Sequence, residues 1–280
     1  MFFPVSSTSH LVLVQHWLIE RGSDIPAPDS AEMIFFDLVV HMGTLISMAV
    51  VFRASLTRFL SQFLSGVRVG FRGEGKAAGR RRLTVRLGVM GLVSVGVTGL
   101  VGFPLKAVFE EVFARPNMIA GTLCVTGILL WWTDVLPRRT RRLEGIGVGT
   151  AAVVGLGQAL ALLPGLSRSG TTIAFGLFCG MKRRWAAEYS FFIAFPTIVG
   201  ASLLQFLEVL SLEAQGAIGI VPLAIGFVVA AVVGIASLHV VLRLLYRARF
   251  RFFSYYVWAL AALILLATSQ GWLAGVELVD

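Results

Sequence analysis

Long runs without a charged residue constrain this chain more than any other feature. The stretches between Arg86 and Lys106 and between Glu188 and Glu208 each hold 19 uncharged residues. A transmembrane helix needs about 20 mostly apolar residues. Such runs predict membrane helices at 87–105, 116–133, 189–207, 217–242 and 253–272, and a sixth at 33–52, which is apolar apart from Asp37 and His41.

The composition excludes the soluble alternatives. Hydrophobic residues make up 57% of the 280 residues and charged residues only 14%, whereas a soluble domain carries roughly a quarter charged residues. A cytosolic enzyme, a disordered chain and a secreted disulfide scaffold are therefore excluded. Cys124 and Cys179 lie in apolar stretches and form no spaced metal or redox set.

Two further apolar segments, 1–19 and 146–180, do not fit a simple span. Pro4 and a Ser/Thr cluster interrupt the first, and the sequence PGLSRSGTT, with Arg168 inside it, interrupts the second. Irregular backbone at membrane depth is tolerated only where protein or a wet cavity surrounds it. We therefore expect two re-entrant helix–loop–helix hairpins, the first without its first arm.

The basic residues predict the topology. Of 24 Lys and Arg residues, 20 lie in four segments between the apolar runs: 53–86, which we expect to be a loop, 138–142, 182–184 and 243–251. If these segments are cytoplasmic, the first hairpin opens outside, the second opens inside, and three spans follow each. Solubility alone would not place so many cations on one side.

This pattern predicts an all-α polytopic membrane protein. The fold would be an inverted-topology repeat of six transmembrane helices and two re-entrant hairpins, with a first repeat over 1–145 and a second over 146–280. Folds of this kind place their site near the midplane, where the broken helices meet.

Arg168 is the most informative single residue. A cation within an apolar segment costs roughly 2.5–3.5 kcal/mol on insertion scales, so it needs an anionic partner or a wet cavity. Small residues and hydroxyls around a guanidinium, followed by a helix N-terminus, are the composition of a phosphate cradle; here they are Gly165, Ser167, Ser169, Gly170, Thr171 and Thr172. The alternative is an ion pair with Asp37 or Glu188.

The first hairpin offers hydroxyls beside an imidazole: Ser6, Ser7, Thr8, Ser9 and His10. Such a pairing serves an activated nucleophile or a proton relay, although Ser/Thr runs also cap helices. If the two hairpins meet, the reaction that fits is phosphoryl transfer from a lipid-embedded phosphate to water or to a serine.

Three other polar residues leave two interpretations open. Asp37 and His41 share a helix face and would add a metal ligand or a second acid/base, or they are merely interfacial polar residues. Gln158 would line the cavity or bond within the bundle.

Four segments carry a family resemblance: FFPVSSTSHLVL at 2–13, FFDLVVHMGTLISMAVVFR at 35–53, QALALLPGLSRSGTTI at 158–173 and AAEYSFFIAFPTIVGA at 186–201. They resemble the undecaprenyl-diphosphate phosphatase family, also called bacitracin-resistance proteins. The resemblance implies hydrolysis of undecaprenyl diphosphate to the monophosphate and phosphate, which recycles the lipid carrier for cell-wall synthesis and confers bacitracin resistance. It also implies the inverted-repeat fold, the bacterial inner membrane and a site open to the periplasm.

The resemblance assigns roles by position. It implies that Ser7 is the nucleophilic or phosphate-binding serine, His10 the acid/base and Arg168 the clamp on the diphosphate. It implies supporting roles in phosphate binding for Ser6, Thr8, Ser167, Ser169, Gly170 and Thr172.

The N-terminus departs from the family pattern. The family has an acidic motif just before its first Pro-Val-Ser-Ser, but Met1 stands where the second acid would be, and Ser9 replaces a usual glycine. Those acids are thought to hold a divalent ion, so Mg²⁺ or Ca²⁺ is expected, although no residues here can be assigned to it. We expect the natural chain to start upstream; the alternative is a catalytically impaired homologue.

The expected partners are a polyprenyl diphosphate lipid and the membrane, with no nucleic acid and with a homodimer left open. A lipid-phosphate transporter or flippase is the alternative function, because broken helices in inverted repeats are typical of transporters. A basic membrane-surface protein would explain neither Arg168 nor the Ser/His cluster.

Overall fold

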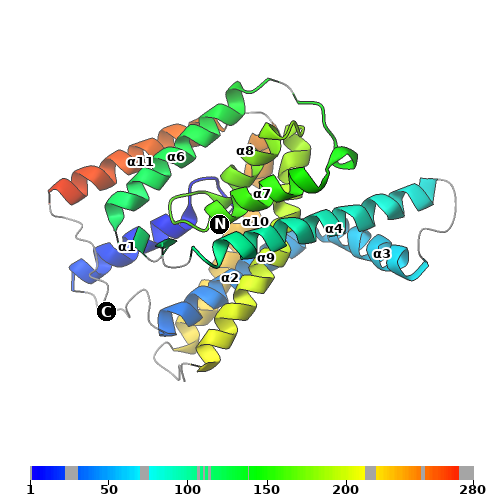
Figure 1. Ribbon diagram of the computed structural model, residues 1–280. Helices are drawn as coiled ribbons and strands as arrows, with labels where there is room; N and C mark the ends of the chain where they lie inside the picture. Colours follow the sequence, from blue (N-terminus) through cyan, green and yellow to red (C-terminus); the bar gives the residue numbers. More distant parts are fainter. Residues whose placement is uncertain are drawn as a thin grey trace.

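The computed structural model describes residues 2–22, 31–69, 76–105, 108–109, 111–112, 115–137, 139–211, 219–246 and 250–270. Within these ranges the chain forms α-helices and one short 3₁₀ turn, and no strand (Figure 1). The helices are α1 (Ser7–Glu20), α2 (Ala31–Val51), α3 (Arg53–Val69), α4 (Lys76–Gly102), α6 (Pro116–Val135), α7 (Val148–Leu160), α8 (Arg168–Phe178), α9 (Arg183–Ser211), α10 (Ile220–Tyr246) and α11 (Arg251–Ser269), with the turn η1 at Leu143–Gly145.

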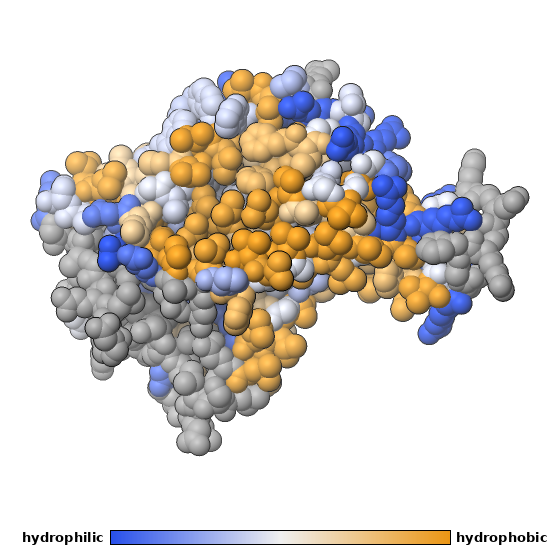
Figure 2. Space-filling model, in the orientation of Figure 1, coloured by the Kyte–Doolittle hydropathy of each residue, from blue (hydrophilic) through white to orange (hydrophobic). Residues whose placement is uncertain are grey.

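Five of the described helices, α4, α6, α9, α10 and α11, are long and apolar enough to cross a bilayer. Helices α2 and α3 pass the same test only as a pair, bent by 81°, so the described residues provide five crossings, or six if this pair is one broken span. Large apolar side chains on these helices face outward, such as Leu100 at 79% exposure and Ile220 at 81%, and Figure 2 shows a broad apolar belt across the molecule. The predicted all-α polytopic membrane protein is confirmed.

The segment 53–86, which the sequence suggests as a basic loop, is helical over most of its length. Helix α3 turns away from α2 by 81°, and α4 begins at Lys76, about three turns before Arg86, the last of its basic residues. Figure 1 shows α3 and the first half of α4 projecting side by side from the bundle. The prediction of a loop was wrong because Phe59 and Phe63 of α3 pack over Gly88 of α4, which gives the amphipathic segment an apolar surface to fold against.

Segment 146–180 is a helix hairpin, as predicted. Arg141 and Met181, which flank α7 and α8, form a parallel bridge, since the Arg141 N–H donates to Gly180 O at 3.1 Å and the Lys182 N–H donates to Arg141 O at 3.0 Å. A segment whose two ends are hydrogen-bonded together returns to the side from which it started. Helix α1 corresponds to a single arm, preceded by the irregular residues Phe2–Ser6.

Asp134, at the end of α6, connects two other helices on the basic face, the side of the molecule that carries the basic segments 138–142, 182–184 and 243–251. Its carboxylate forms an ion pair with Arg183 at 3.1 Å and accepts a hydrogen bond from the Arg251 N–H at 2.8 Å. The end of α6 and the starts of α9 and α11 therefore lie together, as the topology inferred from charge requires. The division into repeats at 1–145 and 146–280 stays a prediction.

Buried hydroxyls line the contact between α4 and α7. Ser94 donates to Ala151 O at 2.7 Å, and Thr98 donates to Gly155 O at 3.1 Å. Gln158 continues this row with its amide nitrogen, which donates to Thr98 and to Thr197 of α9. Of the two interpretations of Gln158, the structure supports bonding within the bundle.

Candidate active site

The tip of the second hairpin requires a glycine. Gly165 has a φ of +97°, and a Cβ there would overlap the Thr122 hydroxyl oxygen of α6. Both the left-handed backbone and the lack of space therefore exclude a side chain.

Two threonine hydroxyls of helix α6 form hydrogen bonds with the backbone of this tip. Thr122 donates to Pro164 O, Thr126 donates to Gly165 O at 2.6 Å, and the Ser167 N–H donates to Thr126 Oγ1 at 3.1 Å. Ser167 Oγ in turn accepts from the Gly170 N–H at 3.2 Å, as an N-cap of α8. The irregular loop thus has partners for its polar backbone atoms within the protein, as required at membrane depth.

The two tips meet through crossed hydrogen bonds. The Gly165 N–H donates to Ser6 Oγ at 3.0 Å, and Ser169 Oγ donates to Phe2 O at 3.2 Å. Ser6 and Ser9 also share a bond of 2.9 Å. Ser6 and Ser169 are the chain neighbours of Ser7 and Arg168, so these bonds bring the first turns of α1 and α8 together.

The side chains of Ser7 and Arg168, two of the predicted site residues, take no part in the hydrogen bonds that hold the two tips in place. Both are half-buried, and neither side chain has a hydrogen bond to any residue that the structure describes. Each is the first residue of its helix, where the unpaired N–H groups and the helix dipole favour an anion. The first turns of two helices, one beginning with a serine and the other with an arginine, therefore lie together.

The alternative of an internal ion pair for Arg168 gains no support in the described residues. Glu188 pairs with Arg184 at 2.8 Å, and no ion pair joins Asp37 to Arg168. His41 lies close enough to Arg168 to be influenced by its charge, and its Nδ1–H donates to Asp37 O at 2.6 Å.

Two supporting residues have structural contacts. Thr172 donates to Arg168 O at 2.7 Å and bonds to Ser190 of α9, so its hydroxyl lies in the α8–α9 contact. Gly170 lies where a Cβ would come within 3.0 Å of Leu130 of α6, so it permits close packing as well as donating to Ser167. The side chain of Thr8 lies outside the described part of the structure.

His10 has a partner that sequence reasoning missed. Its Nδ1 lies 2.8 Å from Ser6 O, and since a carbonyl only accepts, Nδ1 carries the proton. Nε2 therefore accepts, and Tyr256 of α11 donates to it at 2.7 Å. The only available signal was a Tyr-Tyr pair near the start of the last apolar run, and nothing in the sequence linked it to His10.

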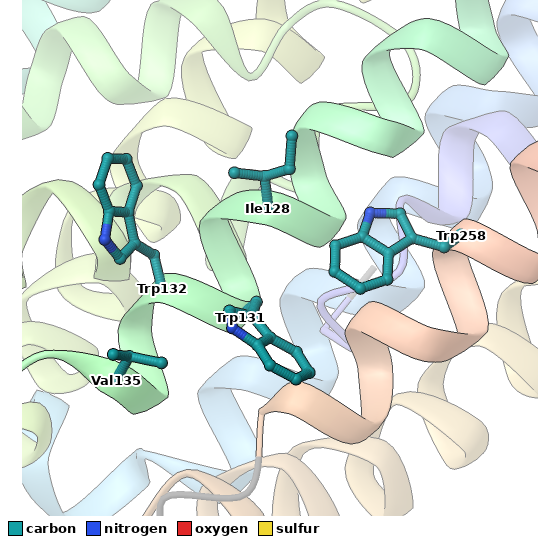
Figure 3. Close-up of a pocket in the computed structure, with 5 residues that line it drawn as sticks. All are labelled: Ile128, Trp131, Trp132, Val135 and Trp258. Carbon is teal, nitrogen blue, oxygen red and sulfur yellow. The ribbon is translucent and has the colours of Figure 1, made fainter.

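A hollow lined by aromatic side chains lies apart from this site. It lies between α6 and α11 and is lined by Ile128, Trp131, Trp132, Val135 and Trp258 (Figure 3). None of these side chains titrates or can act as a nucleophile, and the tryptophans lie near the basic face, as residues of an interfacial aromatic belt do.

The donor set for a metal is incomplete. No group of three His, Cys, Asp or Glu side chains converges among the described residues. Asp37 and His41 supply at most two ligands, fewer than a divalent ion takes from a dedicated protein site. The described residues offer no complete ligand set of their own for an ion, and the expected Mg²⁺ or Ca²⁺ stays a prediction.

These observations define a polytopic membrane protein with a polar site built where two broken helical segments meet. The chain belongs to the family described as Bacitracin resistance protein BacA, which matches residues 1–263. It is 59% identical over 261 residues to an undecaprenyl-diphosphatase of Alkalilimnicola ehrlichii, covering 93% of this chain and 89% of the relative. It is 56% identical over 273 residues to an undecaprenyl-diphosphatase of Halorhodospira halophila, covering 98% and 93%.

Proposed function

We propose that this chain hydrolyses undecaprenyl diphosphate to undecaprenyl phosphate and inorganic phosphate. The observation that carries the proposal is the crossed pair of bonds, Gly165 to Ser6 and Ser169 to Phe2, which leaves Ser7 and Arg168 uncommitted at two adjoining helix N-termini. The relatives named undecaprenyl-diphosphatase support the substrate.

Arg168 and the N-terminal amides of α1 and α8 would bind the diphosphate oxygens and stabilise the charge that develops on them. Ser7 Oγ or a water molecule attacks the terminal phosphorus, and the bond from that phosphorus to the bridging oxygen breaks. Undecaprenyl phosphate leaves with the bonding electron pair. If Ser7 attacks, water then hydrolyses the phosphoserine.

His10 would accept the proton of the nucleophile. Since Nδ1 donates to Ser6 O, Nε2 carries the basic electron pair, and the Tyr256 hydroxyl occupies it as a donor. The proton would reach Nε2 across the Tyr256 hydroxyl, or directly once that hydroxyl moves aside. The Ser6 carbonyl holds the ring in this tautomer, which is the arrangement a general base needs.

The charge topology and the family support a proposal for the location. We place the protein in the bacterial inner membrane with the basic segments in the cytoplasm and the site open to the periplasmic side. The prenyl tail would lie along the exposed apolar faces of the spans, and product release would return the lipid carrier to cell-wall synthesis, with bacitracin resistance as a consequence.

Phosphate release from undecaprenyl diphosphate by the purified protein in detergent tests the proposal. Arg168→Ala is expected to lower kcat/KM by about 100- to 1,000-fold, because the guanidinium acts on the transferring group, and His10→Ala by about 100-fold. Arg142→Ala, which removes an exposed cation, should leave the rate unchanged. Unchanged release in both site variants would overturn the site, and substrate binding without any release by the wild type would favour a transporter.

A further inference from the structure

A second hollow, lined by four cations and by apolar side chains, lies on the basic face, away from the hairpin tips. It occupies about 520 Å³ between the end of α6, the end of α8 and the start of α9. Its lining is Thr133, Leu136, Pro137, Arg139, Leu177, Lys182, Arg183 and Arg184. Figure 2 shows hydrophilic residues gathered around the segment that follows α6.

Two of the four cations are not neutralised. Arg183 pairs with Asp134 at 3.1 Å, and Arg184 pairs with Glu188 at 2.8 Å. Arg139 and Lys182 have no acidic partner among the described residues. After pairing, the hollow keeps about two positive charges.

The burial of Arg139 is a second indication of a ligand, separate from the net positive charge of the hollow. Its Nε atom is buried and has no hydrogen-bond partner in the described structure. A buried donor left unpaired costs about 1–3 kcal/mol or more when it is charged, so it is retained where an acceptor binds. The guanidinium fork matches two oxygens of a phosphate.

The start of α9 adds donors on the same wall. Lys182 precedes the helix and uses its own N–H on Arg141 O, so the N–H groups of Arg183 and the next two residues open the helix without intrahelical acceptors. A helix of 29 residues presents there the positive end of its dipole.

We propose that this hollow is a second phosphate-binding site, separate from the reaction site and independent of the phosphatase activity. Arg139 and Lys182 would contact the phosphate oxygens, with the amides at the start of α9 behind them. Two sources offer this chemistry: the head group of an anionic lipid at the membrane surface, or free inorganic phosphate. Either ligand would link the ends of α6, α8 and α9.

The first comparison in the test uses two substitutions that keep the net charge, one in the hollow and one as a matched control. Arg139→Lys removes the Nε donor and the planar fork, while Arg142→Lys makes the same change at an exposed residue three positions on. The unfolding temperature of each purified protein in detergent is followed as phosphatidylglycerol, phosphatidylcholine or inorganic phosphate is added, at constant ionic strength.

Phosphatidylglycerol or inorganic phosphate should raise the unfolding temperature of the wild type, while phosphatidylcholine should not. Arg139→Lys should weaken the apparent affinity by roughly tenfold, and Arg139→Gln with Lys182→Gln should abolish the response, while Arg142→Lys behaves as the wild type. A response to phosphatidylglycerol alone identifies the lipid as the source, and a response to phosphate alone identifies the free ion.

Without ligand, all variants should unfold at the wild-type temperature, since Arg139 and Lys182 have no protein partner to lose. An equal response in the Arg139 and Arg142 variants, or no response of the wild type to either probe, would overturn the proposal. A lowered starting temperature for Arg139→Lys would also count against it, because Arg139 would then have a structural role.

Discussion

The two hairpin tips share a sequence pattern but differ in how they are held. Pro4, Ser7 and Ser9 in the first tip repeat the spacing of Pro164, Ser167 and Ser169 in the second. Helix α6 holds the second tip through the backbone atoms of Pro164, Gly165 and Ser167.

The first tip is held mainly by side chains. Ser6 has a φ of +57°, the one positive value outside glycine among the described residues, and His10 reaches α11 through Tyr256. Ser167 is used as a helix cap, whereas Ser7 has no described bond. The second tip therefore serves as a scaffold next to Arg168, whereas in the first tip Ser7, the proposed nucleophile, stays without a described bond.

Gly165→Ala should produce the largest loss of stability, because it disrupts the contact between the second tip and α6. A side chain at a φ of +97° that also overlaps Thr122 should cost about 3 kcal/mol of folding free energy. Gly180→Ala is the matched control: its φ is +84°, but the space around it is open, so only about 1 kcal/mol is expected. Unfolding temperatures in detergent compare the two, and equal losses would show that α6 does not clamp the tip.

Ser7→Ala against Ser167→Ala tests the different uses of the paired serines. Ser7→Ala should lower kcat by about 100-fold and leave the unfolding temperature unchanged, because its hydroxyl has no described structural bond. Ser167→Ala should cost about 1 kcal/mol of stability through loss of the cap. If both variants lose stability and activity alike, the two tips have equivalent roles.

Tyr256→Phe should produce the smallest effect, about tenfold in kcat/KM, since it removes one hydrogen bond to His10. Tyr255→Phe is the matched control: Tyr255 is 52% exposed and Tyr256 48%, but Tyr255 packs against Trp131 and Trp258. A positioning role also predicts that Tyr256→Phe has no further effect in a His10→Ala background.

The nitrogen spectrum of His10 supplies a readout that is independent of turnover. ¹⁵N NMR should show the proton on Nδ1 and a shift of the Nε2 resonance in Tyr256→Phe but not in Tyr255→Phe. An unchanged Nε2 resonance would mean that Tyr256 does not hold this nitrogen.

Local patterns predicted the membrane helices because each depends on a continuous apolar run, and α6 was expected at 116–133 and observed at Pro116–Val135. They also predicted that PGLSRSGTT would break a helix, since proline and glycine act locally. The helical form of 53–86 was not predicted, because it depends on packing between α3 and α4.

The sequence by itself determined the membrane class and the grouping of the basic residues, because charge and apolar length do not depend on distant contacts. The residues expected to carry the chemistry were also proposed from the sequence, and they stay a prediction. Only the tertiary structure decided which hydroxyls are engaged in hydrogen bonds within the protein. Ser6, Ser167, Ser169 and Thr172 look like Ser7 in the sequence, but each is committed to a hydrogen bond. A hydrogen bond depends on which two groups lie next to each other in the folded chain. The contact between the two tips and the position of Tyr256 beside His10 could therefore be known only from the tertiary structure.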